Sequence, residues 1–123
     1  YIHSVDSIKL AKKISDEQIK QNKRVKIFIQ VNIGLEEQKS GVNIYQIDEL
    51  LNFCKELRLD VIGLMCIPPA NQESNEYFKK MNFLNNKSNL KEISMGMSSD
   101  YLDAIKNDAT YLRIGSSIFG KRY

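Results

Sequence analysis

Apolar segments of strand length alternate with amphipathic segments of helix length along almost the whole chain. Five strands are predicted at residues 2–5, 25–33, 59–67, 93–97 and 111–115, and the clearest is 25–33, where apolar residues alternate with a period of two. Between them, apolar residues recur at helical spacing over residues 7–21, 43–57, 74–84 and 100–107. No hairpin turn signal joins two strands. The pattern predicts an α/β fold in which parallel strands are connected by helical crossovers.

Two architectures satisfy this pattern. One is an open, doubly wound sheet, and the other is part of a (β/α)₈ barrel of the TIM type. A whole barrel takes about 250 residues, whereas this chain has 123. About five strands and four helices would make a little over half of a barrel, and residues 1–123 show no sign of a second domain. The chain begins at Tyr1, in or just before a strand, so we expect it to be a segment of a longer domain.

Local signals refine the helix starts. Asp6 and Ser7 are both good N-caps for the first helix. Asn43, followed three residues later by Gln46, predicts a capping box that opens the second helix. Ser74 or Asn75 is expected to cap the third helix.

Composition argues against several classes of function. The net charge of +3 comes from lysines spread among acidic residues, without a basic block, so we expect solvated faces rather than a nucleic-acid surface. No apolar run approaches the roughly 20 residues needed to cross a bilayer. Cys54 and Cys66 have no metal-ligand spacing and are expected to be buried free thiols in a reducing, cytoplasmic compartment.

The ends of the last two strands carry the residues best suited to a ligand. Ser98 and the serine after it stand where a helix begins, and Gly115 and Ser116 follow the last strand. Such backbone and hydroxyl donors form a phosphate-binding cup when two neighbouring strands supply them. Arg113 is expected to point into a barrel interior, where it would face a ring nitrogen. Helix capping and a structural ion pair are the simpler alternatives for these residues.

Two further residues have a functional and a structural interpretation. Lys39 lies in a polar loop, either as a surface lysine or as an amine at the mouth of the site. His3 is the only histidine, and we expect it to be a packed strand residue rather than a catalytic base.

Four segments strongly resemble the pyridoxal 5′-phosphate (PLP) homeostasis proteins, the YggS/PROSC family. They are IQVNIGLEEQKSG, GLMCIPP, ISMGMSSDYLDAI and YLRIGSSIFGKR, and the start IHSVDSIKLAKKI extends the resemblance over essentially the whole chain. The resemblance implies a barrel of PLP fold type III, similar to the alanine racemase N-terminal domain. It also implies a protein that buffers or delivers PLP without an established reaction of its own.

The resemblance assigns roles to individual residues. Ser98, Gly115 and Ser116 would bind the phosphate, and Met97 would pack beside the ring. Arg113 would face the pyridine nitrogen, where an arginine keeps that nitrogen unprotonated and weakens the ring as an electron sink. Lys39 matches the lysine of the family's KSG loop. PLP-dependent apo-enzymes would be the partners that receive the cofactor, and the complete protein would be a monomer.

One expected element is absent. The Schiff-base lysine of this family lies on the first barrel strand, in a stretch resembling AVSK, and no such stretch occurs here. The chain therefore resembles only the C-terminal half of the barrel, and we expect its two outer strands to have unpaired edges. Two alternatives stay open: a PLP-dependent racemase-like enzyme on the same barrel, and a remnant without PLP function whose lysines bind polyanions.

Overall fold

The computed structural model describes residues 1–35, 40–69, 73–97 and 99–113, and of Arg113 the backbone. These residues form a parallel sheet of five strands: β1 (Ile2–Val5), β2 (Lys26–Gln30), β3 (Asp60–Met65), β4 (Glu92–Met97) and β5 (Tyr111–Arg113). Four α-helices connect them: α1 (Ile8–Gln21), α2 (Ile47–Glu56), α3 (Asn75–Lys87) and α4 (Tyr101–Lys106). The predicted alternation of strands and helices is confirmed, element by element.

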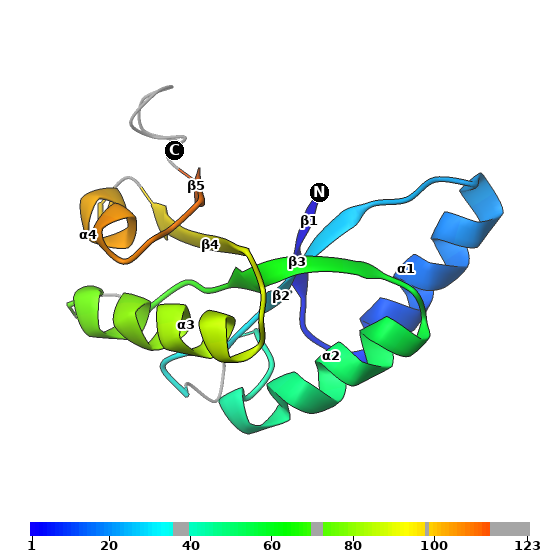
Figure 1. Cartoon of the computed structure of the whole chain (residues 1–123), viewed down its shortest axis with the longest axis horizontal. Coiled ribbons are helices and arrows are strands. Elements are labelled where there is room, and N and C mark those ends of the chain that lie inside the picture. Colours follow the sequence, from blue (N-terminus) through cyan, green and yellow to red (C-terminus); the bar gives the residue numbers. More distant parts are fainter. Residues whose placement is uncertain (36–39, 70–72, 98, 114–123) are drawn as a thin grey trace.

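The order of the strands decides between the two predicted architectures. Each strand pairs in parallel with the next strand along the chain, in the order β1-β2-β3-β4-β5. A doubly wound sheet reverses its order at a switch point and carries helices on both faces. Here the helices follow one another around one side of a curved sheet (Figure 1). The described part of the chain is a half-barrel.

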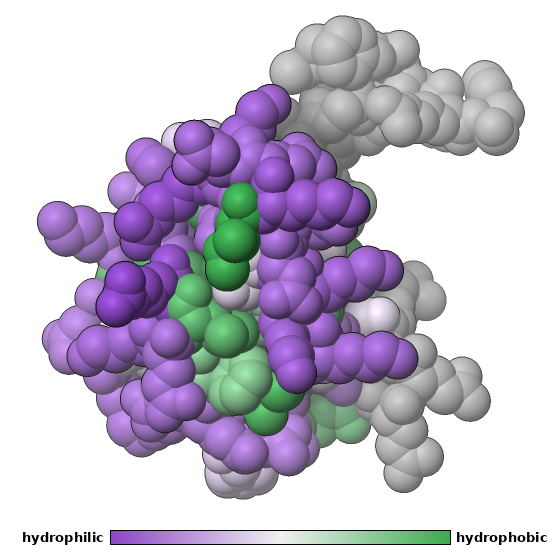
Figure 2. Space-filling model, turned by 90° about the vertical axis from the view of Figure 1, so that its right-hand side faces the viewer, coloured by the Kyte–Doolittle hydropathy of each residue, from purple (hydrophilic) through white to green (hydrophobic). Residues whose placement is uncertain are grey.

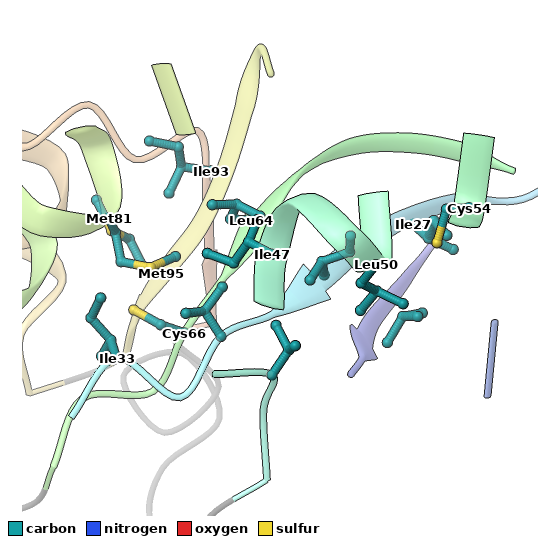
Figure 3. Packing of buried hydrophobic residues seen from close by; sticks show 14 of the residues in the cluster. Ile27, Ile33, Ile47, Leu50, Cys54, Leu64, Cys66, Met81, Ile93 and Met95 are labelled. Carbon is teal, nitrogen blue, oxygen red and sulfur yellow. The ribbon is translucent and has the colours of Figure 1, made fainter. Parts of the chain in front are cut away.

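A single apolar core lies between the sheet and the helices (Figure 3). Alternate strand residues, such as Ile27, Leu64 and Ile93, point into it. All four helices contribute to the same cluster, through Ala11, Ile14, Ile47, Leu50, Cys54, Phe78, Met81 and Ala104. Because one cluster receives residues from every helix, all four helices cover the same face of the sheet. The predicted burial of Cys54 and Cys66 as free thiols is also confirmed.

One buried polar side chain connects a helix to the sheet. Asn85, in the last turns of α3, is almost fully buried. Its Oδ1 accepts a hydrogen bond from the backbone N–H of Leu64 at 3.0 Å, and its Nδ2 donates to the carbonyl of Leu90 at 3.1 Å. Both polar ends of the amide are thereby satisfied, as burial of an amide requires.

Three local predictions need correction. Ser74 stands at the N-cap position of α3, but its side chain makes no capping hydrogen bond. The predicted strand at residues 25–33 ends at Gln30, because Val31 leaves the ladder and forms a bridge with Val42. The capping box at Asn43 is wrong. The Asn43 side chain accepts a hydrogen bond from Tyr45 N at 2.9 Å and caps a short 3₁₀ helix, η1 (Ile44–Gln46), so that α2 begins only at Ile47.

Apolar surface remains accessible near the outer strand β1. A groove of about 360 Å³ lies between α1, β1 and the loop after α1, with Ile2, Leu10, Ile14 and Val25 among its lining residues. Figure 2 views the side of the molecule on which α1 lies, where apolar residues surface between hydrophilic ones. In the described residues β1 and β5 are the outer strands of the sheet, as predicted. No helix in this part of the chain has the length and apolar character needed to cross a membrane.

Candidate functional site

The carboxyl ends of five parallel strands meet at one edge of the sheet, where sites form in folds of this kind. Of the six predicted site residues, Met97 ends β4, and the backbone of Arg113 pairs with it across β4 and β5. Lys39, Ser98, Gly115 and Ser116 lie outside the described residues, as does the Arg113 side chain. The structure therefore brings together the ends of β4 and β5, which carry or precede most of the predicted site residues. The roles of those residues stay predictions.

Gly96 shapes the end of β4. Its φ of +102° lies in a region that L side chains rarely adopt, and an added Cβ would stand 2.7 Å from the Cβ of Ala104. The register between β4 and β5 also shifts between Ser94 and Met97. Glycine is required here because the strand bends over α4 at close range. The bend leaves Met97 43% exposed, at the end of a strand whose preceding residues are buried.

A network of hydrogen bonds around Asp100 fixes the turn after β4. Its Oδ1 accepts from the backbone N–H of Met97 at 2.7 Å, and its own N–H donates to the Met97 carbonyl at 3.1 Å. Its Oδ2 accepts from the hydroxyl of Ser74 at 2.9 Å. Asp100 therefore joins the loop before α3 to the loop before α4. Sequence reasoning missed this role, because Ser74 was expected to cap its own helix and Asp100 was considered only as the start of the helix at residues 100–107.

The loop after β2 is anchored in a similar way. Val42 N donates to the carbonyl of Gln30 at 2.8 Å, and Asn32 N donates to the carbonyl of Val42 at 2.9 Å. Gly41, at a φ of +119°, donates its N–H to Oδ2 of Asp6 at 3.0 Å. Asp6 had been considered as a helix cap, but the hydroxyl of Ser7 caps α1 instead. The carboxylate after β1 thus holds the far end of the loop that contains Lys39.

Aromatic rings cover the face of the sheet opposite the helices. Phe28 is fully buried but lies outside the helix-facing core, between Ile27 and Ile29, which belong to it. The ring of His3 stands 4.4 Å from that of Phe28 and 5.9 Å from that of Tyr111, measured between centroids. His3 is thus a packed strand residue, as predicted. The rings form an apolar floor inside the half-barrel, below the carboxyl ends of the strands.

Hydrogen bonds extend this floor across the half-barrel. Nδ1 of His3 lies 2.7 Å from Oγ of the buried Ser94. The rings of Tyr1 and Tyr111 stand 5.5 Å apart. A hydrogen bond to Tyr1, followed by partial burial and the nearby charge of Glu92, raises the pKa of Tyr111 to about 12. The Tyr111 phenol is neutral at physiological pH, as tyrosine ordinarily is.

The described inner face of the half-barrel is aromatic and apolar. The rings of Phe28 and Tyr111 lie on it, with their centroids 5.0 Å apart. Among the described residues, no cluster of three or more histidine, cysteine or acidic side chains could hold a metal ion.

Comparison with known sequences decides the family. The model of the family described as "Alanine racemase, N-terminal domain" matches residues 1–123. The chain belongs to that family. Among curated members, it is 38% identical over 131 residues to the pyridoxal phosphate homeostasis protein of Aquifex aeolicus (strain VF5). It is 33% identical over 131 residues to the protein of the same name from Escherichia coli (strain K12).

A solved structure of a protein described as a COG0325 family member is also similar. PipY of Synechococcus elongatus PCC7942, in a structure with PLP bound, matches with a TM-score of 0.88 and 29% sequence identity, over 97% of this chain and 60% of PipY. The alignments with the Aquifex and Escherichia proteins cover 98% and 99% of this chain but 58% and 56% of those proteins. The chain thus spans a little over half the length of these relatives, as the sequence predicted.

Proposed function

We propose that the protein to which residues 1–123 belong binds PLP and serves PLP homeostasis as a non-catalytic carrier. The observation that carries this proposal is the match of nearly the whole chain to PipY in its PLP-bound form, at a TM-score of 0.88. The names of the Aquifex and Escherichia relatives support it. PLP-dependent apo-enzymes would then receive the cofactor. The two buried free thiols suit a reducing compartment, for which we propose the cytoplasm.

The proposed contacts follow from the family pattern at the rim of the half-barrel. Ser98, Gly115 and Ser116 bind the phosphate through hydroxyl and backbone donors. Arg113 faces the pyridine nitrogen, and Met97, exposed at the end of β4, packs beside the ring. When bound, PLP supplies an aldehyde that reacts with amines and a ring that withdraws electrons. This chain's residues bind and orient it, and an arginine at the nitrogen restrains its reactivity.

The covalent anchor comes from outside residues 1–123. The family's Schiff-base lysine has no counterpart in this sequence, and Lys39 belongs to a different loop. Residues 1–123 expressed alone should therefore bind PLP weakly and without a covalent bond. A tight adduct that borohydride reduction makes permanent would contradict this, and would point to Lys39 or another lysine of this segment as an anchor.

The test uses the complete reading frame that carries this sequence. Purified protein titrated with PLP should show saturable binding and the absorption band of lysine-bound PLP. Arg113→Ala should shift that band or weaken binding, whereas Arg24→Ala, which removes an exposed arginine at the opposite, amino end of β2, should do neither. Incubation with alanine enantiomers should give no racemisation. Absence of saturable PLP binding would refute the proposal, and efficient racemisation would favour the enzyme alternative.

A further inference from the structure

We infer that Asp100, together with Ser74, is a positioning residue that holds the carboxyl end of β4 in the shape that receives the PLP phosphate. The inference rests on the proposed function, because it concerns the same rim. It adds residues that the family pattern did not assign. Asp100 would not touch the cofactor but would act through the turn it holds.

The first argument is that neither Ser74 nor Asp100 caps its own helix with its side chain. Ser74 is the N-cap residue of α3 and Asp100 that of α4, yet neither side chain bonds to its own helix. Serine and aspartate at this position normally accept a hydrogen bond from the first helical turn. Here the Ser74 hydroxyl donates to Oδ2 of Asp100 instead, over 26 residues of sequence. Local preferences that are overridden in this way are typical of functional sites.

The second argument is the tightness of the turn. Both the N–H and the carbonyl of Met97 are bonded to Asp100, one to its side chain at 2.7 Å and one to its backbone at 3.1 Å. A bond from an N–H to a carboxylate is among the shorter and stronger kinds. On the other side of Met97, Gly96 is pressed against Ala104. Met97 and Asp100, which flank residues 98 and 99 in the sequence, are thus both held in place.

The third argument is electrostatic. A carboxylate beside an expected phosphate is unfavourable, because like charges repel. Asp100 is nevertheless the residue at the end of this turn, and the structure shows both of its oxygens accepting hydrogen bonds. The presence of Asp100 is explained by the two hydrogen bonds that its carboxylate accepts, from Met97 N–H and Ser74 O–H, rather than by contact with the ligand.

A fourth observation shows that the two loops are joined at more than one point. Nδ2 of Asn107, at the end of α4, donates to Oδ1 of Asn75, at the start of α3, at 2.8 Å. The same nitrogen also donates to the Asp103 carbonyl at 2.8 Å. The start of α3 is therefore bonded to both ends of α4. These bonds fix the position of the loop after β4 relative to the loop after β3.

The experiment compares PLP with pyridoxal, which lacks the phosphate, in the complete reading frame. Asp100→Ala removes both bonds and should weaken PLP binding by about tenfold, because only part of the free energy of the two bonds is passed on to the ligand. Pyridoxal binding should change by less than about twofold. Ser74→Ala removes only the tie between loops and should weaken PLP binding by about threefold. Asp103→Ala removes the same charge from a side chain that makes none of these bonds and keeps the backbone carbonyl that accepts from Asn107, so it should leave both affinities unchanged.

Asp100→Asn separates geometry from charge. The asparagine carbonyl can accept from Met97 N–H, and its amide can donate to the Ser74 oxygen, so PLP affinity should equal or exceed that of the wild type. The exchange rate of the Met97 amide, measured without ligand, should rise in Asp100→Ala but not in Asp100→Asn. Equal losses for PLP and pyridoxal in Asp100→Ala, or an asparagine variant as weak as the alanine variant, would overturn the inference. If the wild type binds PLP normally, such a result leaves the proposed function standing; if the wild type binds no PLP, both fall.

Discussion

Nδ1 of His3 lies 2.7 Å from Oγ of Ser94, although β2 and β3 stand between the strands that carry them. Three strand spacings in a flat sheet would separate these positions by roughly 14 Å. The side chains can meet only because the sheet curls around the face opposite the helices. The bond is therefore a direct consequence of the half-barrel's curvature, and it also stabilises that curvature.

Ser94→Ala tests this relationship. The substitution removes the hydroxyl from a buried position, so the free energy of unfolding should fall by about 1–2 kcal/mol, as for a hydrogen bond lost inside a protein. Urea unfolding followed by circular dichroism measures the change. Ser4→Ala, on the exposed side of β1, is the matched control and should have almost no effect. Equal stability of the two variants would show that the His3–Ser94 bond carries no stabilising free energy.

Gly96→Ala should destabilise the protein by about 2–4 kcal/mol, because it combines an unfavourable φ with a steric clash. The two causes can be separated. Ala104→Gly removes the Cβ that an alanine at position 96 would meet at 2.7 Å, but leaves the φ of +102° in place. The double variant should therefore be less destabilised than the sum of the two single changes. Strict additivity, measured by thermal or urea unfolding, would show that the clash is relieved by other movements.

Burial of Cys54 predicts a loss of stability at alkaline pH. Burial raises the pKa of its thiol from the ordinary 9.0 to about 11. Below pH 9 the thiol is protonated in both states, and the stabilisation is fully present. Between about pH 9 and 11 only the unfolded chain loses the proton, so the free energy of unfolding should fall by up to about 2–3 kcal/mol.

The comparison with Cys54→Ala isolates this contribution. The variant should start lower at neutral pH, because it leaves a small cavity, but should fall less steeply between about pH 9 and 11. Lysines and tyrosines titrate equally in both proteins, so the difference in slope reports on Cys54 alone. Parallel pH profiles for the two proteins would mean that the thiol is not buried as the structure shows.

Asp6→Ala should loosen the loop after β2. Its carboxylate accepts the Gly41 N–H at 3.0 Å, so removing it frees one anchor of residues 34–41. Cleavage after Lys39 by a lysine-specific protease should become several-fold faster, because local opening costs less free energy. Asp16→Ala, at an exposed site on α1, is the control for the loss of one negative charge. An unchanged cleavage rate at Lys39 would show that the bridge between Val31 and Val42 is a sufficient anchor.

Periodicity predicted the elements well because each apolar stripe faces one core. The stripe of α2, for example, needed only Ile47, Leu50 and Cys54 at helical spacing, and all three are buried. Periodicity could not distinguish an open sheet from a barrel, because the order of the strands depends on contacts between elements rather than within them. The start of α2 was missed because Asn43 has an alternative local partner in Tyr45 N–H.

The candidate site was predicted less completely. Residue type and strand position drew attention to the residues from Met97 to Ser116, but gave Ser74 the role of a helix cap and Asp100 no role beyond the start of a helix. Nothing in either local sequence indicates that the two side chains bond to each other across 26 residues. Such bonds depend on how two loops approach in space, which neither propensity nor spacing encodes.

The order of the strands has a consequence for how the chain reaches this structure. Each strand pairs with its successor, so the sheet can grow one β-α-β unit at a time, at the low entropic cost of closing short segments. The His3–Ser94 bond is different, because it joins residues 91 positions apart and needs four strands in place. It should therefore form among the last native contacts, after β4 docks. The time at which this bond forms during refolding would report when the growing sheet becomes curved.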